Sequence, residues 1–358
     1  MIGLTSSLIK TYNSMEKTYF TNGTILGLTY NKVFFGERRE NGSISLGLIS
    51  DMILNDLDIH DDIHGCAILE KNFIYIYKSG DALKWKILNV ENLHSDDWDV
   101  EGLTMLRVQS EDKLFFKRDN CNLLTCIDSS MNFFECGAEI GVYQFEKDFV
   151  LYSLIRNTII AKNAINNEII WELSIANLTY DRGGNHYAAL TPKNDVPHQC
   201  LFHHQLLLAL FCTHTAAIDL QTGRVVWEHN IGSEHRYWYH QGRLVLMQGA
   251  YIYELCPDTG AVLRENVPFL QAAQLPLVGR KTNMVGNHER IYFCLAEQKE
   301  IVTLDAATLQ IVAIDKIEHN KEAVLLPPEK IYLSNNKLFV TLQCQKPTVH
   351  NEILVYEV

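Results

Sequence analysis

The sequence lacks the features that mark membrane proteins, exported proteins and zinc sites. No apolar run approaches the about 18 residues of a membrane-spanning helix. Residues 1–10 contain no basic segment followed by an unbroken apolar stretch, so we expect no export signal there. The nine cysteines form no C-x2-C pair. We therefore predict a cytoplasmic protein that makes no membrane contact and keeps reduced, buried thiols.

Positive charge is scarce as well. The chain has 31 Lys and Arg residues against 43 Asp and Glu residues, which gives a net charge of -12 with neutral His. A polyanion such as nucleic acid is therefore disfavoured as the main partner. A basic protein is the better match, and solubility alone is the other explanation of the charge.

Common catalytic signatures are also missing. The sequence contains no G-x-S-x-G, Walker or H-E-x-x-H motif. We predict that the chain is not an enzyme, and we assign it no catalytic residue, no cofactor and no metal site.

What the sequence does contain is a recurring β-strand unit. Helical periodicity over about 11 residues is nearly absent, whereas short β-branched and aromatic runs bounded by Asn, Asp, Gly and Ser recur throughout. One unit, a polar turn followed by a short apolar strand, returns along the whole chain. Its copies lie at 31–35, 71–77, 111–116, 146–152, 204–208, 241–246, 288–293 and 335–340.

The spacing of these copies predicts a propeller. They lie roughly 35 to 57 residues apart, and one four-stranded propeller blade needs about 40 to 50. We predict an all-β fold in which residues 1–358 form a single closed β-propeller of about eight four-stranded blades, with seven as the alternative. Residues 3–12 are expected to complete the last blade beside the C-terminal strands and so close the ring. A closed ring has few free edges, which favours a monomer.

A second landmark gives a family resemblance. Residues 216–227 read A-A-I-D-L-Q-T-G-R-V-V-W, and less complete copies occur at 161–171, 254–263 and 304–312. The segment resembles the A-x-D-x-x-T-G-x-x-x-W repeat of the PQQ-like (quinoprotein alcohol dehydrogenase-like) β-propellers over roughly residues 140 to 320. The motif predicts a hairpin in which Asp219 bonds its own turn and Gly223 has a positive φ, while Trp171 and Trp227 dock between blades.

The resemblance implies a cofactor-free member of that family. Family enzymes that hold pyrroloquinoline quinone and calcium are exported, are longer and often carry adjacent cysteines, and this chain has no Cys-Cys pair. Lipoprotein members carry an export signal and a lipidated cysteine, and we find neither in the sequence. The resemblance therefore predicts the ring without the quinone.

Acidic residues suggest where a basic partner binds. His60 and His64 flank Asp61 and Asp62, a spacing that either holds a divalent cation or forms a solvated acidic loop, and we favour the loop. The next blade is expected to end in a similar group. If neighbouring blades place these groups side by side, the resulting rim would steer a cationic protein. The residues of the second group are Asp96, Asp97 and Asp99.

Two aromatic and Arg-containing segments complete the predicted binding surface. Interfaces are enriched in Tyr, Trp and Arg. The first segment, 234–240, contributes His235, Arg236 and Trp238, although at least half of its rings are expected to be core. The second segment lies in a long loop and contributes Tyr180, Asp181, Arg182, His186 and Tyr187.

These features together predict a function. The sequence indicates a protein-binding propeller that uses one face, and its sharpest form is an inhibitor or immunity protein that covers a basic toxin. The alternative is a sensor of a small ligand, a metal or a glycan at the mouth of the central channel.

Overall fold

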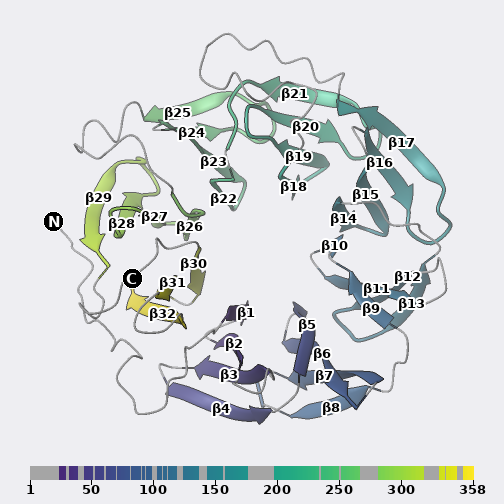
Figure 1. Ribbon diagram of the computed structural model, residues 1–358. Coiled ribbons are helices and arrows are strands. Elements are labelled where there is room, and N and C mark those ends of the chain that lie inside the picture. The colour runs from purple at the N-terminus through teal and green to yellow at the C-terminus, as the bar shows by residue number, and fades with distance from the viewer. Residues whose placement is uncertain are drawn as a thin grey trace.

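Eight sheets, antiparallel except for one short strand, follow one another around a common axis in the computed structural model (Figure 1). The structure describes residues 24–29, 32–38, 44–50, 53–59, 62–69, 71–80, 82–89, 91–92, 94–98, 103–106, 108–110, 112–118, 124–136, 143–155, 158–175, 197–233, 235–249, 251–266, 281–317, 330–334, 336–344 and 350–358. Among them, no helix is long and apolar enough to cross a membrane.

The first four blades occupy the N-terminal half of the chain. Blade one contains β1 (Thr24–Thr29), β2 (Lys32–Arg38), β3 (Ile44–Ser50) and β4 (Ile53–Ile59). Blade two contains β5 (Asp62–Leu69), β6 (Asn72–Ser79), β7 (Ala82–Asn89) and β8 (Ser95–Trp98). Blade three contains β9 (Leu103–Leu106), β11 (Lys113–Arg118), β12 (Leu124–Asp128) and β13 (Phe133–Cys136). Blade four contains β14 (Tyr143–Lys147), β15 (Val150–Ile155), β16 (Thr158–Asn163) and β17 (Ile169–Ser174), with the short parallel strand β10 (Val108–Gln109) on its inner edge.

The last four blades complete the ring. Blade five contains β18 (Gln199–His203), β19 (Leu206–Leu210), β20 (Thr215–Asp219) and β21 (Val225–His229). Blade six contains β22 (Tyr237–His240), β23 (Arg243–Gln248), β24 (Tyr251–Leu255) and β25 (Val262–Asn266). Blade seven contains β26 (Val285–Gly286), β27 (Arg290–Leu295), β28 (Glu300–Asp305) and β29 (Ile311–Lys316). Blade eight contains β30 (Ile331–Ser334), β31 (Lys337–Cys344) and β32 (His350–Glu357).

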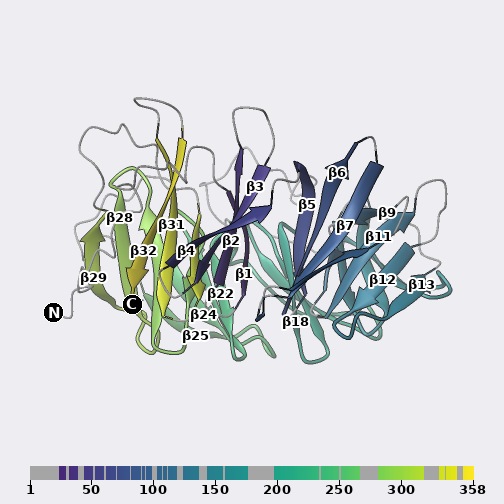
Figure 2. The same ribbon diagram turned by 90° about the horizontal axis from the view of Figure 1, so that it is seen from below.

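The predicted all-β propeller is confirmed, with eight sheets in the described residues. Blade eight, which has three strands there, lies beside blade one in both views (Figures 1 and 2). Residues 3–12, which we expected to complete this blade, lie outside the residues that the structure describes.

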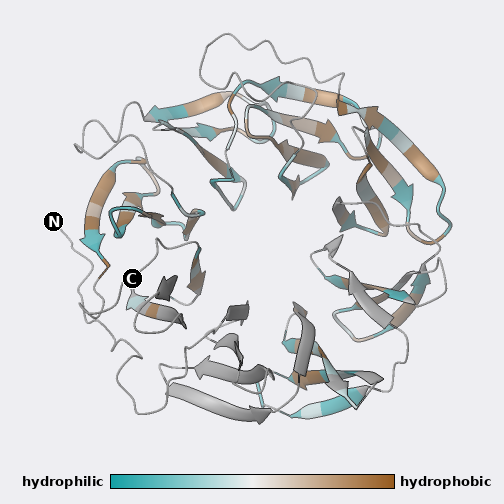
Figure 3. Cartoon of the chain, in the orientation of Figure 1, coloured by the Kyte–Doolittle hydropathy of each residue, from teal (hydrophilic) through white to brown (hydrophobic). Residues whose placement is uncertain are grey.

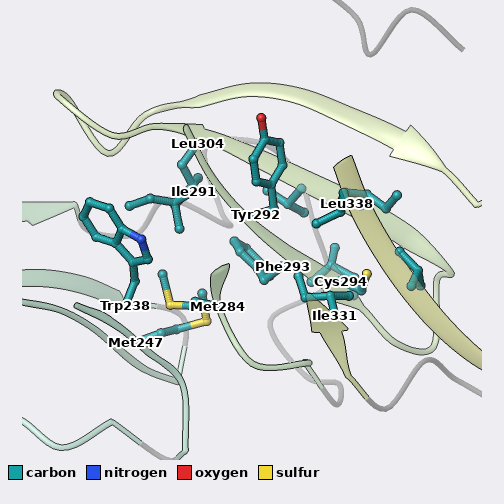
Figure 4. Packing of buried hydrophobic residues seen from close by; sticks show 14 of the residues in the cluster. Trp238, Met247, Met284, Ile291, Tyr292, Phe293, Cys294, Leu304, Ile331 and Leu338 are labelled. Atoms are coloured by element: carbon teal, nitrogen blue, oxygen red, sulfur yellow. The ribbon is translucent and has the colours of Figure 1, made fainter. Parts of the chain in front are cut away.

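The second strands of blades five, six and seven are almost entirely buried because a neighbouring blade covers each of their faces. The strands β19, β23 and β27 have four or five consecutive buried residues, without the alternation of a sheet that has one wet face. Figure 4 shows the resulting core, where Met247 of blade six, Ile291 of blade seven and Ile331 of blade eight meet. Lateral packing of this kind explains why the strand unit recurs at blade intervals.

The predicted Asp–Gly–Trp motif forms the joint between consecutive blades. Asp219 Oδ1 accepts hydrogen bonds from the backbone N–H groups of Gln221 (3.1 Å) and Thr222 (2.7 Å), which shapes the turn from β20 to β21. Gly223 has φ +67°, and a Cβ added there would lie 2.5 Å from the ring of Trp171 in blade four. The Trp171 indole donates to the carbonyl of Leu220 at 2.8 Å. The predicted roles of Asp219, Gly223 and Trp171 are therefore confirmed.

The same joint repeats one blade further on. Trp227 of blade five packs on Gly260, where an added Cβ would lie 2.6 Å from its ring, and its indole donates to the carbonyl of Pro257 at 2.8 Å. Blades four, five and six are therefore joined by the same contact, and the predicted structural role of Trp227 is confirmed.

The joint between blades six and seven uses an arginine. Register places Arg264 where the preceding blades have tryptophan, opposite Glu254. The guanidinium of Arg243 instead donates to the carbonyl of Ala306 at 2.6 Å, and Ala306 follows Asp305 as Leu220 follows Asp219. The hydrogen bond to the turn carbonyl is thus retained while its donor changes.

The carboxylate of Asp219 predicts how the stability of the protein changes at low pH. Hydrogen bonds from the hydroxyl and backbone N–H of Thr222 hold the pKa of Asp219 below its ordinary value. A lowered pKa contributes stability above the unfolded-state value, and this contribution is lost as pH falls through the folded-state value. Asp219→Asn is expected to retain the turn without this loss, since Asn163 accepts the matching bond from the backbone N–H of Ile165 (2.8 Å) in blade four.

The measurement is the urea midpoint of wild type and Asp219→Asn at pH 7 and at about pH 3. The midpoint should fall less on acidification in the variant. An equal fall in both proteins would contradict the assigned role of the carboxylate.

Candidate functional site

A β-bulge recurs at the same position in the outer strand of four consecutive blades. In each case the register shifts by one residue directly after the turn between the third and fourth strands. The residue left without a partner is apolar every time, and bulges of this kind re-aim a side chain and interrupt a free sheet edge. These residues are Ile170, Val226, Leu263 and Val312.

The bulges help to create a band of exposed apolar side chains, which we call the apolar belt. Its members occupy two adjacent positions in each of the outer strands β17, β21 and β25, and each is between 37% and 58% exposed. Figure 3 shows hydrophobic segments on these strands, along the outer circumference of the ring. The members are Ile169, Ile170, Val225, Val226, Val262 and Leu263.

The inter-blade joints bring the belt members of neighbouring blades close to one another. Trp171, the next residue after Ile170, packs on Gly223, which lies two residues before Val225. Trp227 connects Val226 to Gly260, two residues before Val262, in the same way. Scattered apolar side chains are ordinary on a protein surface, but a set that recurs at equivalent positions in three neighbouring blades is typical of an interaction site.

Acidic side chains outnumber basic ones beside the belt. Glu168 and Glu172 of blade four and Glu265 of blade six are exposed, while the exposed basic neighbours are Arg224 and Arg264. Arg264 also lies 3.4 Å from the buried carboxylate of Glu254, so the positive charge of Arg264 is partly compensated within the protein.

One more glutamate lies beside the belt, but it is partly buried, whereas the other three are exposed. Glu228 follows Trp227 in β21, and burial raises the pKa of its carboxyl, an effect partly opposed by His214. The negative charge around the belt therefore comes mainly from the exposed glutamates.

Two of the predicted binding residues, His235 and Arg236, lie on the connection from blade five to blade six. His235 is exposed, and its ring lies 4.1 Å from that of His198. His198 Nε2 also lies 2.6 Å from the hydroxyl of the buried Ser233. No sequence pattern indicated His198 or Ser233, because their proximity depends on the return of the chain from the outer strand. The binding role of His235 and Arg236 stays a prediction.

The prediction that Trp238 belongs to the binding surface is wrong. It is only 4% exposed and packs in the core shared by blades six, seven and eight (Figure 4). Strand β22 directs this ring between blades, and the Arg243 guanidinium lies 5.4 Å from its centre. Trp238 therefore stabilises the ring and is not accessible to a partner.

The expectation that the acidic groups lie side by side was also wrong where the structure describes them. Asp62 and His64 lie in β5, the inner edge strand of blade two, and Asp96 and Asp97 lie in β8, its outer edge strand. Two strands separate them, which corresponds to about 14 Å across the sheet. These residues do not form one continuous rim.

The exposed aspartates of β8 have local partners. Asp97 Oδ1 lies 3.6 Å from Lys86 Nζ and accepts a hydrogen bond from Tyr77 (3.4 Å), and Asp96 lies 3.3 Å from His94. The remaining predicted binding residues lie outside the described part of the chain. They are His60, Asp61, Asp99, Tyr180, Asp181, Arg182, His186 and Tyr187.

Comparisons with known proteins place the chain in a structural class. No family model matches the sequence, and no curated protein matches it. Among solved structures it is similar to BamB from Moraxella catarrhalis, with 15% identity, a TM-score of 0.50, and coverage of 92% of this chain and 96% of that one. It is also similar to Saccharomyces cerevisiae Sqt1, with 11% identity, a TM-score of 0.55, and coverage of 94% and 96%. At this level of identity the likeness concerns the fold alone. The chain is a β-propeller protein, and its similarity to PQQ-like repeats remains a resemblance.

Proposed function

We propose that this β-propeller is a non-enzymatic scaffold that binds a basic protein through its apolar belt. The observation that carries the proposal is the row of exposed apolar side chains at equivalent positions on three neighbouring outer strands. Leaving such side chains in water forgoes about 25 cal/mol for each Å² of apolar surface, which a partner recovers by covering them. The belt therefore supplies an apolar contact area.

The charge of the chain supports a basic partner. Interfaces combine an apolar centre with a polar rim, and here the rim includes Glu168, Glu172 and Glu265. The net charge of -12 adds a long-range field that speeds the arrival of a cationic protein. Affinity then comes from the belt and association rate from the field.

A more specific form of the proposal is inhibition. A cytoplasmic, monomeric propeller that covers a basic toxin, such as a nuclease, would present carboxylates to a surface built to bind phosphate. Support for this form comes from the acidic balance of the chain and from the glutamates around the belt.

In the first test, the protein is immobilised and incubated with a lysate of the cells that encode it. Bound proteins are then eluted with increasing salt. The captured basic protein is then purified and titrated directly against wild type and the double variant Val226→Asp/Leu263→Asp. We expect the variant to bind at least about 10-fold more weakly, because each substitution places a charge in an apolar contact. Binding should also weaken as ionic strength rises.

The matched control is Tyr251→Asp. Tyr251 is also an exposed apolar residue, but it begins β24 at the opposite end of blade six from the turn that precedes the belt. The control should bind like wild type, and circular dichroism should show that all variants are folded. Capture of no basic protein, or equal affinities for the belt variant and the control, would overturn the proposal.

A further inference from the structure

A cluster of three metal-ligating side chains lies at the boundary between blades five and six. His203 is the last residue of β18, His204 begins the turn to β19, and Asp258 lies in the turn from β24 to β25. One ligand atom from each residue lies within 4.8 Å of the other two. Asp258 is at least 54 positions away from the two histidines in the sequence.

His203 is held in the orientation of a metal ligand. Its ring is buried, and Nδ1 lies 2.8 Å from the hydroxyl of Tyr239, which fixes the ring. Its Nε2 points outward and lies 3.1 Å from Asp258 Oδ1. Histidines that bind metals commonly use one ring nitrogen for the metal and the other for such a hydrogen bond. Tyr239 is thus the positioning residue of the cluster.

The second histidine is set beside the first by the backbone. His204 has φ +52°, a left-handed conformation that is uncommon for residues other than glycine. Its ring centre lies 4.2 Å from that of His203. Lys147 of blade four holds the turn by donating to the carbonyl of His204 at 2.9 Å. The strained position places a second imidazole where the cluster needs it.

We propose that His203, His204 and Asp258 bind a zinc ion. Two imidazoles and one carboxylate are a ligand set that Zn²⁺ uses when water fills the fourth position. With zinc–ligand distances of about 2.0–2.2 Å, the edge of a tetrahedral site is about 3.4 Å. The 3.1 Å from His203 Nε2 to Asp258 Oδ1 is close to such an edge. The exposed His204 and Asp258 side chains can close the remaining distance by changing rotamer.

A zinc ion at this position would cross-link two blades. Asp258 directly follows Pro257, whose carbonyl accepts the indole hydrogen bond of Trp227 from blade five. The ion would therefore reinforce a joint that already exists, and its binding is independent of any protein partner. Failure of the zinc proposal thus leaves the proposed function intact, and the reverse also holds.

The test uses untagged, full-length protein freed of metal by a chelator. Zinc is titrated in competition with a chromophoric chelator, and cobalt absorption reports the coordination geometry. We expect one tightly bound zinc per chain, a tetrahedral cobalt spectrum and a rise in the melting temperature. His204→Ala and Asp258→Asn should each lower affinity at least about 10-fold, and Tyr239→Phe about 10-fold with the stoichiometry unchanged.

The matched control is Asp96→Asn. It removes the carboxylate of a different His–Asp pair, one that is fully on the surface, in which His94 Nε2 lies 3.3 Å from Asp96 Oδ1. This control should bind zinc like wild type. Absence of one-to-one binding by the wild-type protein, or equal affinities of wild type and the folded Asp258→Asn variant, would overturn the proposal.

Discussion

Replacing Trp171 by alanine is expected to lower the free energy of unfolding by about 3–5 kcal/mol, the range for removing a large buried aromatic side chain. Trp171 is 8% exposed, covers Gly223 of the next blade and donates to the carbonyl of Leu220 at 2.8 Å. The substitution removes both the packing and the hydrogen bond. The measurement is urea unfolding at pH 7, read as the midpoint and the slope.

Two further variants separate the parts of this contact. Trp171→Phe keeps a ring but loses the donor, so it should cost only about 1–2 kcal/mol. Gly223→Ala attacks the contact from the other side, and Gly80→Ala is its control, since Gly80 has a similar φ of +64° with nothing within 4 Å of an added Cβ. If Gly223→Ala and Gly80→Ala cost the same, the Trp171 contact does not hold the blades together.

The joints that the sequence predicted are those with a local signature. Asp219, Gly223 and Trp227 lie within nine positions of one another, and each has a backbone or packing role that its residue type reveals. The propeller itself was predictable for the same reason, because each blade repeats one apolar strand pattern. The features that could be predicted from the sequence are therefore those whose residues lie within one blade repeat.

What could not be predicted depends on two blades at once. Arg243 was not recognised as a joint because it lies in a central strand, and its acceptor, Ala306, belongs to the next blade. Asp258 was not recognised as a partner of the two histidines because it reaches His203 only where blades five and six meet. The apolar belt was missed because a one-residue bulge exposes Val226, which an alternating pattern does not reveal. The predicted acidic rim was wrong because Asp62 begins blade two, whereas we expected it to end blade one, so Asp62 and Asp96 lie on opposite edges of one sheet.

Arg243→Ala is expected to lower the free energy of unfolding by about 3 kcal/mol, because it leaves a buried carboxylate without its main partner. Arg243 makes two bonds to Glu254, of 2.8 and 3.1 Å, and one to the Ala306 carbonyl at 2.6 Å. Arg264, which lies 3.4 Å from Glu254, keeps the loss at the lower end of the range of about 3–5 kcal/mol for a broken buried pair. Urea unfolding again measures the change.

The double variant Arg243→Ala/Glu254→Leu tests the cause, since it removes the buried charge together with its partner. It should recover most of the lost stability, because the penalty lies in the unpaired carboxylate and the lost bond to Ala306 accounts for only about 1 kcal/mol. Arg290→Ala removes a pair of similar length, 2.8 Å to Asp305, in which both side chains are more than a quarter exposed, and it should cost about 1 kcal/mol. If the double variant is no more stable than Arg243→Ala, the joint between blades six and seven depends on the carbonyl bond and not on the buried ion pair. That outcome would make Arg243 the direct counterpart of Trp171 and Trp227, with the same acceptor position in each turn and no separate role for its charge.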